Sequence, residues 1–259
     1  LAWVGALHFS PDGRHLAVTR LTEIDLVEFN DSPELIPLCS ATGNEVVAFS
    51  PDSTSIAIGS EHGRLQLWSV TPGNRLADLK GHEAGVWCVD WSRDGRLLAS
   101  GGMDGTVRFW ALDQPRRPRI RTELWSDLLG SIAFSSDSSH LIATDRTGQG
   151  VLFHTATFSE LHLIPDVFHP LAATRDGKLL ALASDWRLVK TTLSDGTSEP
   201  TPLSLAGKSA ITAFAVSSDN RFAAFAHEGG ELVVWNLDRF TVHPTPLPTI
   251  SGVKSLAIS

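Results

Sequence analysis

The sequence predicts an all-β protein built from small antiparallel sheets that repeat along the chain. Between residues 81 and 110, three short apolar runs are separated by Asp94-Gly95 and Asp104-Gly105, a pair typical of tight reversals between antiparallel strands. The first of these turns recurs. The Ser or Thr that opens it stands at positions 10, 50, 92, 135, 174, 217 and 259, in steps of 40, 42, 43, 39, 43 and 42 residues.

Repeats of this length favour one ring-shaped domain. A single small sheet cannot bury both of its faces, so each unit must pack against its neighbours, and a closed ring leaves only short, protected edges. The turns define six complete units and the first strand of a seventh. We place the units at roughly 1–40, 41–81, 82–125, 126–165, 166–207 and 208–250, with a partial unit at 251–259.

Each complete unit is expected to hold four strands, located by short apolar runs between turn residues. In chain order the runs are 3–9, 15–18, 24–29 and 35–36; 46–49, 56–58, 65–68 and 75–79; 86–91, 97–101, 106–110 and 120–124; 132–134, 141–143, 151–153 and 161–163; 171–173, 179–182, 188–189 and 203–205; 211–216, 222–225, 232–235 and 244–248.

Two of these strands should be irregular. The run at 244–248 contains three prolines, which cannot donate to a neighbouring strand, so this outer strand should be short. In the third unit the apolar residues are Val86, Val89 and Trp91, a step of three followed by a step of two. Strict alternation would give two equal steps, so we expect a β-bulge at 87–88.

The stretch from Gly81 to Trp110 resembles one repeat of the WD-repeat β-propeller family. It carries Gly81-His82, an aromatic-Ser-x-Asp-Gly turn, the Ser100 and Asp104 positions and a closing Trp110, although Ala111 replaces the family's final Asp. The resemblance implies a β-propeller of four-stranded blades. It also implies that a structural tetrad, the hydrogen-bonded set of His82, Ser100, Asp104 and Trp110, is buried across three strands.

The tetrad residues have a second interpretation, as the His-Ser-Asp triad of a hydrolase. The sequence disfavours it, because the spacing is that of the repeat and no Gly-x-Ser-x-Gly nucleophile elbow is present. The sequence also lacks motifs that would bring carboxylates together or supply metal ligands at a typical spacing. We therefore expect no catalytic residue, no bound metal and no cofactor in this domain.

Composition narrows the class of partner. The net charge of −8 argues against nucleic acid, because phosphate contacts are made by clustered Lys and Arg. No apolar run reaches the ~18 residues that span a bilayer, and the given N-terminus does not open on a charged-then-apolar leader, so we expect a cytoplasmic protein without membrane contact. This expectation leaves open a leader upstream of Leu1. Cys39 and Cys88 lie in different units and are expected to be reduced. The 16 Arg against 5 Lys and the absence of Tyr indicate a bacterial source.

Partner-contacting residues should lie on the face that carries the bulges, where the resemblance places the family's binding surface. Large side chains there are typical of interaction hot spots. We expect the following residues on this face: Trp87, Met103, Trp125, His169, Trp186, Glu45, Glu61 and Lys254. The opposite face should carry one basic loop, whose charges we expect to be solvated unless they meet a neighbouring domain or an acidic partner: Arg116, Arg117, Arg119 and Arg121.

These features favour a non-catalytic interaction or sensor module that presents its loops to a protein or peptide partner. The first residue is Leu1 and the last unit is incomplete, so we expect the chain to be a piece of a larger protein, and the resemblance implies a multidomain bacterial signalling or defence protein. Partners include other domains of the same polypeptide. One alternative is a Tol-B-type or peptidase-associated propeller of the cell envelope, which shares the 9–17 motif. A third is a propeller enzyme such as a lactonase or glycosidase.

Overall fold

The described part of the protein consists of strands and their connecting turns, with no helix. The computed structural model describes residues 4–20, 22–29, 34–40, 45–112, 120–123, 129–167, 169–173, 178–182, 187–192, 197–204, 211–216, 221–227, 231–239 and 241–242. The strands form six four-stranded antiparallel sheets, each made of four consecutive strands. This confirms the predicted all-β class and the predicted four-stranded antiparallel sheets.

The first three sheets come from the N-terminal half. Sheet A contains β1 (Val4–Phe9), β2 (His15–Arg20), β3 (Glu23–Glu28) and β4 (Glu34–Ser40). Sheet B contains β5 (Val46–Phe49), β6 (Ser55–Gly59), β7 (Leu65–Ser69) and β8 (Arg75–Leu79). Sheet C contains β9 (Val86–Trp91), β10 (Leu97–Gly102), β11 (Thr106–Ala111) and β12 (Ile120–Glu123).

The remaining sheets follow the same order. Sheet D contains β13 (Leu129–Phe134), β14 (His140–Asp145), β15 (Gln149–His154) and β16 (Ser159–Pro165). Sheet E contains β17 (His169–Ala173), β18 (Lys178–Leu182), β19 (Arg187–Thr192) and β20 (Ser198–Ser204). Sheet F contains β21 (Ile211–Val216), β22 (Phe222–His227), β23 (Leu232–Asn236) and β24 (Thr241–Val242).

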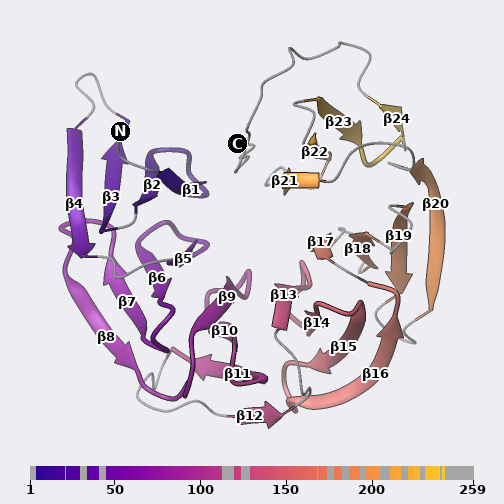
Figure 1. The fold of residues 1–259 in the computed structure, drawn as a ribbon, viewed down its shortest axis with the longest axis horizontal. Coiled ribbons are helices and arrows are strands. Elements are labelled where there is room, and N and C mark those ends of the chain that lie inside the picture. Colours follow the sequence, from indigo (N-terminus) through magenta and orange to yellow (C-terminus); the bar gives the residue numbers. More distant parts are fainter. Residues whose placement is uncertain are drawn as a thin grey trace.

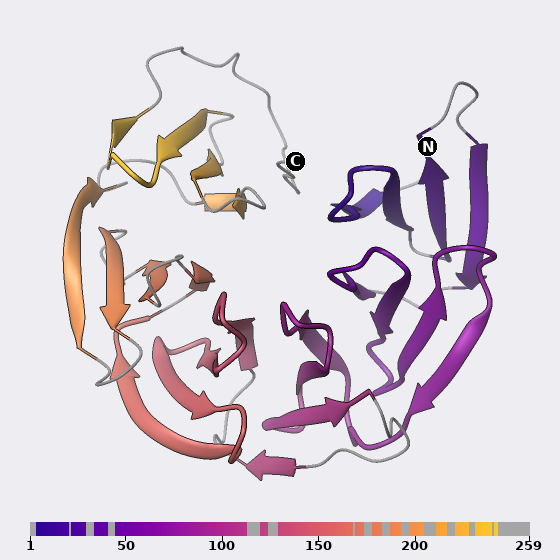
Figure 2. The ribbon, with the colours of Figure 1, turned by 180° about the vertical axis from the view of Figure 1, so that it is seen from behind.

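The six sheets lie side by side in an arc around a common centre, with the first strand of each sheet innermost and the fourth outermost (Figure 1). Each innermost strand contacts the innermost strand of the next sheet, from β1 to β21. Sheets A and F stand at the two ends of the arc, as the view from behind also shows (Figure 2). None of the described residues forms a helix long and apolar enough to span a membrane.

The recurring Ser turn has one hydrogen-bonding scheme in sheets A to D. Its hydroxyl donates to the Asp two residues later at 2.6–2.7 Å, and it accepts from the first amide of the following strand at 2.8–2.9 Å. The four Ser-Asp pairs are Ser10-Asp12, Ser50-Asp52, Ser92-Asp94 and Ser135-Asp137. The period in the sequence therefore reflects a turn that the side chain itself closes.

Apolar clusters of described residues join sheet A to B, B to C and C to D. In the cluster between sheets A and B, Ala17, Ile24 and Leu26 of sheet A meet Phe49 and Val70 of sheet B. The corresponding positions form the clusters between B and C and between C and D. Every such sheet thus has a forward face, which packs on the following sheet, and a backward face, which packs on the preceding one.

Two strand irregularities test the sequence analysis. The bulge predicted at 87–88 is confirmed: Cys88 pairs with Gly101 and Val86 with Gly102, which leaves Trp87 unpaired. In sheet F the described part of the outer strand is β24, in which Thr241 and Val242 pair with β23. The predicted proline-rich run at 244–248 lies outside the described residues, so the expectation of a short strand there stays a prediction.

Candidate functional site

The four tetrad residues come together across sheet C. His82 lies in the segment before β9, Ser100 in β10, Asp104 in the turn after β10 and Trp110 in β11. The Trp110 indole N–H donates to Ser100 Oγ at 2.9 Å, and Ser100 Oγ lies 2.7 Å from His82 Nε2. His82 Nδ1 lies 3.0 and 3.1 Å from the two carboxylate oxygens of Asp104. A carboxylate only accepts, so the chemistry assigns the ring proton to Nδ1 and makes Nε2 the acceptor of the Ser100 proton.

Asp104 is the anchor of this network. Burial acts to raise the pKa of Asp104, but the Thr106 hydroxyl, the Glu83 amide and the neighbouring His82 outweigh burial and hold the pKa well below its usual range. Thr106 Oγ1 donates to the carboxylate at 2.7 Å and the Glu83 amide at 3.0 Å. Buried Arg108 adds an ion pair at 3.2 Å. The carboxylate therefore stays ionised in a place where an unpaired charge would be costly.

Two glycines make room for this network. A Cβ on Gly102 would collide with the His82 ring and with the Asp104 carboxylate. A Cβ on Gly81 would collide with the guanidinium of Arg108. The Gly-His and Ser-Gly-Gly positions of the repeat are therefore explained by close approach of side chains to the backbone.

The tetrad cannot act as a hydrolase triad, although its atoms are in the right order. Ser100 and the His82 side chain are fully buried, as is Trp110. The Ser100 oxygen accepts a hydrogen bond from the Trp110 indole N–H. A serine nucleophile needs its oxygen free to reach a substrate, so the indole blocks that role. The network is thus a structural support.

A surface patch lies beside this support, at the junction of sheets B and C. The backbone of Glu61, in the turn after β6, packs so closely on Gly85 that a Cβ there would lie 2.7 Å from the Glu61 carbonyl oxygen. The Met103 amide donates to the Gly85 carbonyl at 2.7 Å. Trp87 follows Val86, which pairs with the residue before Met103. Glu61, Trp87 and Met103, all exposed, therefore form one surface, which we call the junction patch.

Two other residues expected on this face, Glu45 and His169, are not part of the junction patch. Glu45 is half-buried and lines a hollow of about 40 Å³ together with Cys39. His169 was assigned to the bulge column, but it pairs with Leu182, and the unpaired residue of β17 is Leu171. Pro170 has no amide hydrogen, so the regular ladder breaks immediately after it.

The other predicted positions are outside the described residues or have only their backbone described. Lying outside are Trp125, Trp186, Lys254, Arg116, Arg117 and Arg119. Arg121 is in β12, where its backbone pairs with Arg108. Among the described residues, no group of three His, Cys, Asp or Glu side chains is arranged to hold a metal ion.

The sequence reasoning missed Asp90, which links sheets C and D. Its carboxylate accepts from the Phe134 amide of β13 at 2.8 Å and from the Trp91 amide at 2.9 Å. Burial raises the pKa of Asp90 to about 7, against these two donors, which lower it. The signal in the sequence was an acidic residue between Val89 and Trp91 in an otherwise apolar strand.

A pocket of about 320 Å³ was also missed. It lies beside β7, β8 and the segment leading to His82, and several cationic side chains line it. Arg64, Arg75 and Lys80 contribute to its lining, and Arg75 pairs with Asp78 at 3.5 Å. These residues are too far apart in the sequence to form a recognisable basic run.

Comparison with known proteins shows what part of the chain is similar to a known family. Residues 44–69 and 73–111 match the sequence family described as WD domain, G-beta repeat. These segments contain sheet B and β9 to β11 of sheet C, including the whole tetrad. These two segments of the chain therefore match WD repeats.

Individual relatives match a similar part of the chain. It is 32% identical over 111 residues to the serine-threonine kinase receptor-associated protein of Homo sapiens and of Bos taurus, an alignment that covers 41% of this chain and 31% of those proteins. It is 36% identical over 119 residues to periodic tryptophan protein 2 of Saccharomyces cerevisiae, which covers 44% of this chain and 13% of the yeast protein. The aligned part thus spans less than two thirds of these relatives. They are eukaryotic and lend no support to a bacterial source.

Proposed function

We propose that this protein is a non-catalytic interaction scaffold whose six sheets are blades of one β-propeller, and that the junction patch contacts a protein or peptide partner. The observation that carries the proposal is the exposure of Trp87 and Met103 on two neighbouring segments, which the backbone hydrogen bond from Met103 to Gly85 joins. Aromatic and Met side chains are enriched in interfaces, where they act as anchors. These two exposed side chains are therefore the proposed centre of the contact.

The charge around the patch defines the partner's chemistry. Glu61 and Glu83 are exposed beside Trp87 and Met103. An extended segment with an apolar side chain next to Lys or Arg would bury the apolar pair and meet the acidic residues. A cytoplasmic location inside a larger signalling polypeptide agrees with this role. The name of the kinase receptor-associated relative describes an association with another protein, which supports the same class of function.

The proposal is tested by capture of partners from the source cell with the whole protein as bait. We compare the wild type, the double variant Trp87→Ala/Met103→Ala and a matched control, Leu76→Ala/Leu163→Ala, which removes two exposed apolar residues of outer strands β8 and β16. We expect partners held by wild type and control to be lost from the patch variant. Equal retention by all three baits would refute the assignment of this patch.

A further inference from the structure

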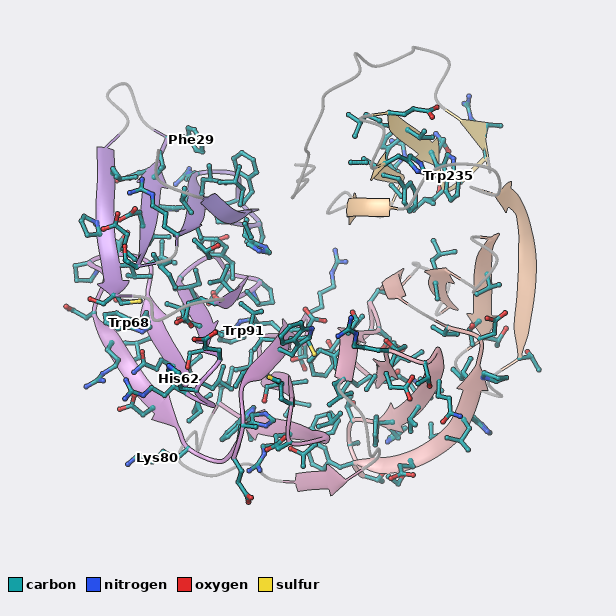
Figure 3. The ribbon with its side chains drawn as sticks, viewed as in Figure 1. Phe29, His62, Trp68, Lys80, Trp91 and Trp235 are labelled. Carbon is teal, nitrogen blue, oxygen red and sulfur yellow. The ribbon has the colours of Figure 1, made fainter. Side chains whose placement is uncertain are left out.

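The pocket of about 320 Å³ lies at the outer part of sheet B, where β8 ends and the chain crosses to sheet C. We call it the β8 pocket. Leu65 and Leu79, which pair across β7 and β8, are buried and line it, and Gly81 contributes from the crossing segment. Lys80 stands at the end of β8, on the outer side of the arc (Figure 3). The volume falls within the range of about 300–1,000 Å³ that small-ligand sites occupy.

The charges of the β8 pocket do not balance. Its lining contains three cationic side chains, Arg64, Arg75 and Lys80, and one carboxylate, Asp78. The carboxylate is already engaged, because it lies 3.5 Å from the Arg75 guanidinium and accepts from the Gln66 side-chain amide at 2.8 Å. Within the described part of the chain, Arg64 and Lys80 have no ion-pair partner. The pocket therefore keeps an excess of two positive charges.

Arg64 and Lys80 also repel each other. They extend the ladder by one position beyond Leu65 and Leu79, so they stand opposite each other on adjacent strands. Like charges in such a pair destabilise a sheet. At the same ladder position sheets A, C and D carry pairs without a cation: Glu23-Ser40, Thr106-Glu123 and Gln149-Pro165. The repeat thus does not require two cations here, and their position beside a pocket points to an anionic ligand.

We propose that the β8 pocket binds a phosphate monoester. Such a group carries a charge of about −1.5 to −2 near pH 7, which matches the excess of two positive charges, whereas a single carboxylate would leave one charge unbalanced. The planar guanidinium of Arg64 is suited to donate two parallel hydrogen bonds to phosphate oxygens, and Lys80 adds a compact point charge. This site goes beyond the scaffold role, because it gives sheet B a ligand of defined chemistry.

The position of the β8 pocket allows two sources for the phosphate monoester. One source is a small phosphorylated molecule, and the other is a phosphorylated side chain of a partner seated on the junction patch. Gly63 lines the pocket and packs on the crossing segment, since a Cβ there would lie 2.8 Å from the Ala84 carbonyl oxygen. Glu61 of the junction patch precedes Gly63 by two residues. A partner on the patch is therefore within reach of the pocket.

Titration of the full-length protein with a blocked phosphoserine, N-acetyl-O-phosphoserine N-methylamide, tests the pocket directly. We expect it to bind at least about ten times more tightly than the blocked aspartate, and to lose affinity below about pH 6, where phosphate takes up its second proton. Arg64→Gln and Lys80→Gln should each weaken binding about three- to tenfold, because each removes one charge-assisted contact. The matched control is Arg93→Gln, an exposed arginine in the turn between β9 and β10, which should bind like the wild type.

Three results would overturn the proposal. They are equal affinity for blocked phosphoserine and blocked aspartate, an affinity that neither pocket substitution changes, and an equal loss of affinity in Arg93→Gln. The three replaced side chains are exposed, so the variants should keep the melting temperature of the wild type. An unchanged melt then shows that a loss of binding is not a loss of fold.

Partner capture with the whole protein separates the two sources, and either outcome supports the pocket once the titration has succeeded. A partner that is lost from the Arg64→Gln/Lys80→Gln bait, and from the wild-type bait after phosphatase treatment of the lysate, carries the phosphate monoester itself. Capture that neither treatment changes identifies a small phosphorylated molecule as the ligand. The titration needs no partner, so its outcome is separate from that of the junction patch.

Discussion

Replacing Ser100 by Ala should destabilise sheet C far more than the loss of one small side chain suggests. Ser100 Oγ is the middle atom of a chain that runs from the Trp110 indole N–H to His82 Nε2. All three side chains are fully buried, so water cannot replace the lost hydroxyl. The substitution therefore leaves one donor and one acceptor unsatisfied.

The size of the effect follows from these two groups. An unsatisfied buried donor or acceptor costs about 1–3 kcal/mol, so the two groups left by Ser100→Ala should lower the free energy of unfolding by about 2–6 kcal/mol. Trp110→Phe removes the indole donor but keeps the hydrogen bond from the Ser100 hydroxyl to His82 Nε2. Its main effect is a small cavity. In the double variant, Ser100→Ala should cost at least about 1 kcal/mol less than it does alone, because the indole N–H is no longer stranded.

Chemical denaturation of the four proteins of this cycle gives the coupling energy, and hydrogen exchange over residues 97–112 tests whether the loss is local to sheet C. The control is Ser159→Ala, an exposed serine at the start of β16, expected to stay within about 0.5 kcal/mol of wild type. If Ser100→Ala behaves like Ser159→Ala, or if the cycle shows no coupling, the argument that the tetrad is one connected network fails.

Three further predictions concern the contacts between sheets. Because burial raises the pKa of Asp90 to about 7, the folded protein holds the Asp90 proton more tightly than the unfolded chain does. The stability that this proton contributes is therefore lost as pH rises from about 4 to about 7. Asp90→Asn should flatten the pH dependence of the melting temperature measured from about pH 5 to about pH 8. Trp91→Phe removes the indole hydrogen bond to β5 and should cost about 1 kcal/mol in denaturation. Gly85→Ala should cost about 1–3 kcal/mol and weaken partner capture, because its Cβ would push against the Glu61 backbone.

Much of the architecture could be predicted because one local interaction repeats. The Ser hydroxyl and the Asp carboxylate two residues later close the same turn in sheets A to D, so the spacing of that pair counts the units. The bulge at Trp87 was predictable for a similar reason, since apolar side chains must return to the buried face after an extra residue. Both inferences use contacts within a few residues of the chain.

Contacts between units left a weaker trace in the sequence. The sequence around Asp90 does not indicate that its carboxylate accepts a hydrogen bond from the Phe134 amide of the next sheet. His169 was misplaced because the column was counted from a regular repeat, and Pro170 moves the break in the ladder to Leu171. Sequence spacing therefore located elements within a sheet, whereas the links between sheets required the three-dimensional arrangement.

The links between sheets converge on the sheet that carries the junction patch. Trp91 donates to sheet B, and Figure 3 shows its side chain between β9 and that sheet. Asp90 accepts from sheet D, and the Asp94 amide donates to Ser138 of the same sheet at 3.2 Å. The tetrad ties β10 and β11 to the segment before β9, so sheet C is held from inside and from both sides. A surface supported in this way loses little conformational freedom on binding, so exposed Trp87 can contribute more of its contact energy to affinity than the same residue on a mobile loop.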